Sequence, residues 1–191
     1  MAVQHINRQG VAYFLHRGLT KTGKPRYYFA RGSDGELAEK VPPGHEIYEN
    51  PNGQVFLRKK TPQFFPAPEL KLVKDAVAKL AGLKYFQVEA KKNAIVVYLP
   101  DENPANAARA LSGLLGASPA QVEKYVAKKS HYSPVLRFVL VDEAKRLFDV
   151  DRWCWLGSID DWFNLSFGEK LPTLVAKYCP HLGKESFFEL M

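Results

Sequence analysis

A short basic and aromatic segment, residues 21–31, contains the side-chain types that nucleic-acid recognition requires. Its cations are Lys21, Lys24, Arg26 and Arg31. Strand alternation places the ring of Tyr28 on the opposite face from its two aromatic neighbours. Lysine and arginine neutralise phosphates, and exposed rings stack on unpaired bases. Successive strand residues face opposite ways, so one face of this segment must be core and the other can be free. The segment predicts a phosphate- and base-binding surface, with core packing of its rings as the alternative.

Other cations extend this basic character along the first two-thirds of the chain. The pair Lys91 and Lys92 occupies a predicted turn, and residues 58–60 form a further basic run. Residues 1–130 carry a net charge of +9 and residues 131–191 carry −2, giving the total of +7. Such asymmetry favours a polyanionic partner for the front of the chain, although solvated lysines alone would also explain it.

Candidates for catalysis are few. The five histidines are scattered, and Cys179-Pro180-His181 has no second pair at zinc-ligand spacing. The neighbours Asp160 and Asp161 allow the hypothesis of a metal-dependent nuclease, but they also suit the first turn of a helix. We therefore predict no catalytic residue, no metal ligand and no cofactor.

The elements that position these residues belong to an α+β protein. Residues 1–60 alternate short apolar runs with turns, which predicts a small antiparallel β module. Three prolines within residues 61–68 predict a linker. Residues 69–191 combine antiparallel strands with about four helices, and within them residues 157–167 are expected to be irregular or to form one short helix.

Two of these helices carry strong boundary signals. Asn103-Pro104 predicts a helix start, Gly116 its end, and Ser118 with Gln121 forms a capping box for the next helix, so that residues 104–129 form a helix pair. The three-residue turn at 116–118 makes this pair resemble the helix-turn-helix DNA-binding motif. The resemblance implies that Pro119, Gln121 and Lys124 face the DNA groove. The strands that follow resemble those of a winged helix, with Lys145 and Arg146 at the tip of the wing. A plain helical hairpin is the alternative.

The aromatic residues of the last third, Trp153 to Phe163 and Phe187 to Phe188, predict core packing and a docked C-terminus. The alternative is a surface for a protein partner or for a homo-oligomer. With 46% hydrophobic residues, 12 Phe and only two cysteines, the chain suits an ordinary core in a reducing, cytoplasmic compartment. It contains no signal-peptide pattern and no apolar run of membrane-spanning length.

These observations predict a non-catalytic nucleic-acid-binding protein, DNA or RNA, that uses its basic front surface and a helix-turn-helix at residues 104–129. A protein-interaction or assembly factor that uses the aromatic C-terminal third is the first alternative. A metal-dependent nuclease is the second.

Overall fold

A computed structural model describes residues 1–155, 157 and 160–190, except for the side chains of residues 112–115. The chain divides into two compact units, residues 1–62 and 63–191. The described residues of the two units contain four α-helices and ten antiparallel strands in three sheets, so the protein has the α+β fold that the sequence predicts.

The first unit consists of two small sheets. Its strands are β1 (Gln4–Ile6), β2 (Ala12–Leu19) and β3 (Pro25–Ala30), which form a meander, and β4 (His45–Glu49) and β5 (Val55–Lys59), which form a hairpin. Leu15 on β2 and Val55 on β5 are both buried. The amide of Asn7 donates to the carbonyl oxygen of Gly53 at 2.6 Å, so a buried polar side chain ties the β4–β5 turn to the meander.

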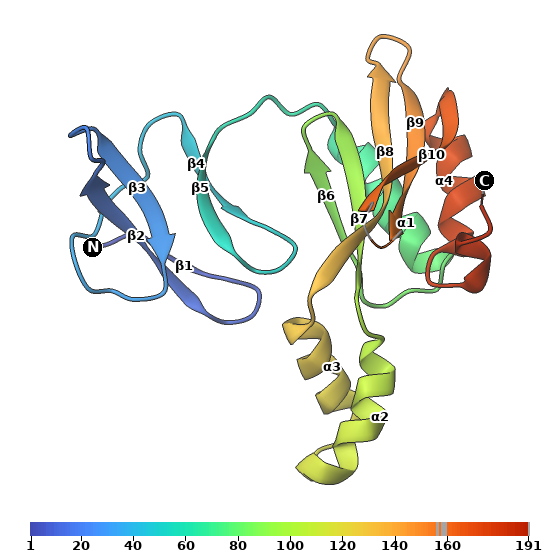
Figure 1. Ribbon diagram of the computed structural model, residues 1–191, viewed down its shortest axis with the longest axis horizontal. Helices are drawn as coiled ribbons and strands as arrows, with labels where there is room; N and C mark the ends of the chain where they lie inside the picture. The colour runs from blue at the N-terminus through green and yellow to red at the C-terminus, as the bar shows by residue number, and fades with distance from the viewer. Residues whose placement is uncertain (156, 158–159, 191) are drawn as a thin grey trace. The chain divides into compact units, whose positions relative to one another are not determined.

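The second unit contains a five-stranded antiparallel sheet with the order β10-β9-β8-β7-β6. The strands are β6 (Gln87–Lys91), β7 (Ala94–Pro100), β8 (Tyr132–Asp142), β9 (Leu147–Trp155) and β10 (Asp160–Lys170). One face of the sheet packs against α1 (Ala67–Lys79) and α4 (Leu171–Tyr178), as Figure 1 shows. Val77 and Leu174 from the helices meet Val97, Phe138 and Val150 from the strands, and all five are buried.

A pair of helices, α2 (Pro104–Leu115) and α3 (Pro119–Lys129), connects β7 to β8 and projects beyond the end of the sheet (Figure 1). The predicted caps are present. The Asn103 side chain accepts from the Ala105 N–H at 3.0 Å, and Ser118 and Gln121 form the capping box. Gly116 ends α2 with a φ of 60°, a conformation that glycine adopts without steric cost.

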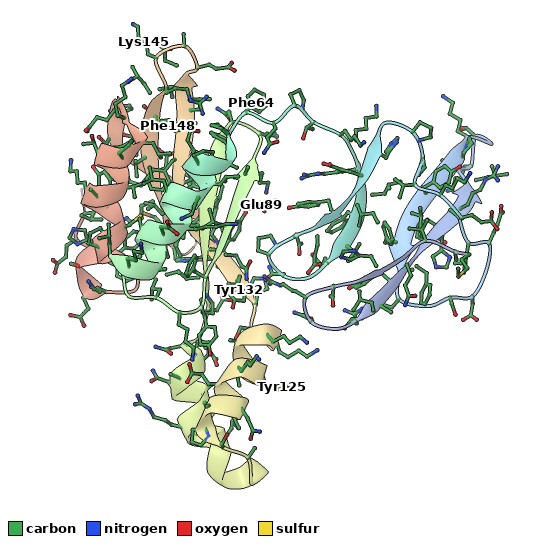
Figure 2. The ribbon with its side chains drawn as sticks, turned by 180° about the vertical axis from the view of Figure 1, so that it is seen from behind. Phe64, Glu89, Tyr125, Tyr132, Lys145 and Phe148 are labelled. Atoms are coloured by element: carbon green, nitrogen blue, oxygen red, sulfur yellow. The ribbon has the colours of Figure 1, made fainter. Side chains whose placement is uncertain are left out.

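Three local features differ from what the sequence predicted. Residues 160–167 lie in the edge strand β10 instead of being irregular or helical. Within the predicted linker, α1 already begins at Ala67, and Phe65 is fully buried with its ring 6.3 Å from that of Phe148. The predicted wing, with Lys145 at its tip, lies at the opposite end of β8 from α3 (Figure 2), roughly 36 Å away at about 3.3 Å per residue. It does not flank α3 as the wing of a winged helix does.

Candidate nucleic-acid interface

The sheet of the second unit has a face that α1 and α4 do not cover, which we call the open face. In each strand, every second side chain points into the core, and the residues between them lie on the open face. One row runs across all five strands in the order Glu89, Val96, Arg137, Asp151, Asn164. A second group adds the three tryptophans of the chain, Trp153, Trp155 and Trp162. The sequence predicted that these rings would be buried in the core. They lie instead on the face of the sheet opposite the main core.

Arg137 is the centre of a fixed polar network on the open face. Its Nε donates to Asp151 Oδ2 at 2.6 Å, and Asn164 Nδ2 donates to Asp151 Oδ1 at 2.9 Å. Its guanidinium carbon lies 4.3 Å from the ring centroid of Trp162, a cation–π contact. No hydrogen bond from the two Nη groups of Arg137 is present among the described residues. The side chain is thus held by Asp151 and Trp162 while its Nη donors remain available to a ligand.

A hollow of about 510 Å³ lies on this face around Arg137. The residues of its wall that can bind a ligand through charge or ring stacking are Lys91, Lys92, Arg137, Tyr98, Trp153 and Trp162. The wall contains three cations and no carboxylate. The Trp162 ring meets the Trp153 ring edge-on, with 5.1 Å between centroids, so the two rings pack against each other in the wall. Cations beside rings suit a ligand that joins an anionic group to a flat apolar one.

Burial raises the pKa of two groups, Tyr98 on the open face and Cys179 at the C-terminal end of α4, each to about 12. The Glu89 carboxylate adds to the shift of Tyr98. Both groups are neutral in the folded protein, whereas in the unfolded chain the thiol ionises from about pH 9 and the phenol from about pH 10. The unfolded state then binds fewer protons than the folded one.

We expect the free energy of unfolding to fall as the pH rises from about 9 towards 12, by at most roughly 1.4 kcal/mol per pH unit for each group. Urea denaturation at a series of alkaline pH values measures this fall. Cys179→Ala removes one of the two groups, so its curve should be shallower than that of the wild type. Equal slopes for the two proteins would contradict the assignment to Cys179.

In the first unit, the structure gathers four of the sequence-predicted residues at one corner of the β2–β3 hairpin. Lys21, Lys24 and Arg26 are exposed, and none has an acidic partner within residues 1–62, all of which are described. Tyr28 stacks on His16 with 5.1 Å between ring centroids, and the Arg26 guanidinium lies 5.3 Å from the Tyr28 centroid. Because these contacts occupy Tyr28, the corner offers cations more readily than a free stacking surface.

Arg31, the fifth residue predicted for this surface, lies apart from them. Arg31 comes just after β3 and is an odd number of residues away from Arg26 and Tyr28. Because successive strand residues face opposite ways, its side chain lies on the other face of the meander. There its Nε donates to the Tyr13 hydroxyl at 3.3 Å. Arg31 is therefore not part of the β2–β3 corner.

The residues predicted to read a DNA groove lie on α3, where Gln121 and Lys124 are both exposed. The Gln121 Oε1 accepts from the backbone N–H of Ser118 at 3.2 Å and from its hydroxyl at 3.0 Å. Gln121 is thus committed to the capping box, and replacing it by alanine would disturb the helix start as well as any base contact. Glu123, which would repel phosphate if it faced the same way, is paired with Lys84 at 3.0 Å.

Asp160 and Asp161 are adjacent residues of a strand, so their side chains face opposite sides of the sheet and do not converge. Among the described residues, no three histidine, cysteine, aspartate or glutamate side chains gather closely enough to hold a metal ion. None of the described helices is long and apolar enough to cross a membrane.

The sequence interpretation missed Arg137, Asp151, Trp153 and Trp162 as candidate site residues. A weak signal was available: Arg137 interrupts an apolar strand, and a lone cation there needs a partner or an exit to solvent. The partners are 14 and 25 residues away along the chain, on other strands. Comparison of the chain with known protein families, with curated proteins and with solved structures found no match.

Proposed function

We propose that this protein binds nucleic acid without transforming it, and that the hollow of the open face holds unpaired nucleotides. One observation carries the proposal: a guanidinium fixed by Asp151 and Trp162 lies in an aromatic hollow whose wall contains three cations and no carboxylate. Sequence-tolerant single-strand binders combine these same two components, cations along the backbone and rings for the bases.

Each part of the hollow has a distinct task. The Nη groups of Arg137 donate to a phosphate, and Lys91 and Lys92 at the β6–β7 turn take the flanking phosphates. Trp162 and Trp153 provide apolar surface on which bases can stack. Only an unpaired strand has bases that are free to stack on the face of a sheet. The cations of the β2–β3 corner form a separate phosphate-binding surface on the first unit.

We expect the variant Lys91→Gln with Lys92→Gln to bind single-stranded DNA and RNA more weakly and to flatten the log-affinity against log-salt slope by about 1–1.5, at about 0.7 per phosphate. Lys92 has a φ of 53°, where the strain comes from the Cβ atom. Glutamine keeps an unbranched Cβ, so it removes the charge without changing that strain. Fluorescence anisotropy with labelled oligonucleotides across a salt series is the measurement.

The matched control is Lys74→Gln with Lys79→Gln, which removes the same charge from α1 on the other side of the sheet. This control should leave the slope unchanged. Lys24→Ala with Arg26→Ala tests the β2–β3 corner separately, with an expected flattening of about 1–2 if duplex is the ligand and less for single strands. Absence of binding by the wild type to any nucleic acid at low salt would refute the proposal.

Protein assembly is a second candidate function, and exposed rings favour it. Phe163, Phe167 and Phe188 are 48%, 75% and 71% exposed. Arg152 contacts both Phe163 and Phe187, the residue before Phe188. Its guanidinium lies 5.9 Å from the Phe163 centroid, and its Nη1 donates to the Phe187 carbonyl oxygen at 2.9 Å. Large exposed rings commonly mark an interface. Light scattering over a range of concentrations separates the candidates, since a constant mass of 21.6 kDa would argue against self-association.

A further inference from the structure

Helix α3 has two sides with different roles. At about 100° per residue, Val122 and Ala127 fall on the side that is buried in the hairpin. The opposite side forms a stripe, which we call the α3 stripe; its exposed residues are Gln121, Lys124, Tyr125, Lys128 and Lys129. The stripe contains three lysines and no carboxylate, because Glu123 turns away to Lys84.

The α3 stripe has the size and charge of an element that lies in a nucleic-acid groove. Its 11 residues span about 16 Å, and a helix with its side chains is about 10–12 Å wide, close to the width of about 12 Å of the major groove. Tyr125 is 63% exposed among the lysines, so an aromatic side chain accompanies the cations. The complementary charge of a duplex backbone is the feature that selects this partner over an apolar one.

The α2–α3 hairpin is also accessible to a bulky partner. Its two helices pack mainly on each other, and they project past the end of the sheet (Figure 1). A duplex can therefore approach α3 without meeting α1 or α4, which lie against the core face of the sheet.

The α3 stripe and the open face are neighbouring surfaces of one unit. Tyr98 and Pro134 line the end of the hollow nearest the hairpin, where β7 leads into α2 and α3 leads into β8. The Tyr132 hydroxyl donates to the Ala127 carbonyl oxygen at 3.0 Å and so ties α3 to the sheet. In Figure 2, Tyr125 and Glu89, which mark the stripe and the open face, lie on the same side, away from the helix-covered face.

We infer that the ligand of this protein is a nucleic acid in which a duplex continues into an unpaired strand. The α3 stripe contacts the duplex, and the hollow around Arg137 takes the first unpaired nucleotides. This inference rests on the proposed single-strand binding, to which it adds the structure of the ligand.

The test compares three probes of matched sequence: a blunt duplex, the single strand alone, and the duplex carrying that strand as a tail. The full chain should bind the tailed duplex at least about tenfold more tightly than either simpler probe, because the second contact becomes intramolecular. The variant Lys124→Ala with Lys128→Ala should abolish this advantage and flatten the salt slope for the tailed duplex by about 1–2, while leaving single-strand binding unchanged. Alanine favours helix, so the hairpin of this variant stays folded. Lys74→Ala with Lys79→Ala is the matched control.

Two results would overturn the inference and leave the proposed function standing. One is a tailed duplex that binds no better than its tail alone while single-strand binding still depends on Lys91 and Lys92; the proposed function would then stand without the junction. The other is a variant of the α3 stripe that behaves like the α1 control. Loss of binding to all three probes in the wild type would refute the inference together with the proposed function.

Discussion

Replacing Trp162 by leucine is expected to weaken binding of single-stranded nucleic acid by about 5- to 150-fold, the loss that corresponds to roughly 1–3 kcal/mol for one stacked base. The ring lies in the wall of the hollow and supports Arg137 at 4.3 Å, so leucine removes both the stacking surface and the platform of the cation. Trp162→Phe keeps a ring in the same place and should retain most of the affinity.

The neighbouring residue supplies the control. Phe163 lies on the same strand but on the opposite face of the sheet, so Phe163→Leu makes the same ring-to-leucine change without touching the hollow. Its affinity should equal that of the wild type. Anisotropy gives the affinities, and quenching of the intrinsic fluorescence reports stacking directly, since all three tryptophans lie on the open face. If Trp162→Leu and Phe163→Leu bind equally well, the hollow is not the binding site.

Replacing Phe187 by alanine is expected to lower the free energy of unfolding by about 3–5 kcal/mol, the usual cost of truncating a buried phenylalanine. The side chain is only 4% exposed and belongs to the core formed by α1, α4 and the sheet. Its carbonyl oxygen accepts from Arg152 at 2.9 Å, which fixes the segment that carries the ring.

Phe188→Ala is the matched comparison, because that ring is 71% exposed and meets the Phe187 ring edge-on. Its effect should lie within about 0.5 kcal/mol. Urea denaturation followed by far-ultraviolet circular dichroism gives both values. Similar losses for the two variants would mean that the C-terminal segment is held by something other than the burial of Phe187. An oligomer that disappears with Phe188 alone would instead support the protein-assembly function.

The sequence alone determined the features that depend on neighbours along the chain. The caps at Asn103 and Ser118, the glycine that ends α2 and the antiparallel pairing of β6 with β7 all follow from local chemistry. These signals act over three or four residues, so no knowledge of the tertiary structure is needed to interpret them. They were sufficient for the α+β class and for the boundaries of α2 and α3.

Only the tertiary structure decided which residues face solvent. The alternation in β8 separates Phe138 from Arg137, but nothing in that strand says which side two distant helices will cover. Likewise Phe65 lies among prolines, yet it is buried because Phe148, 83 residues later, forms its surroundings. Arg137, Asp151 and Trp162 come from three strands, and hydrogen bonding between those strands brings them into one site. A ring or a cation has the same local sequence whether it fills a core or lines a hollow, since burial is decided by which surfaces pack together.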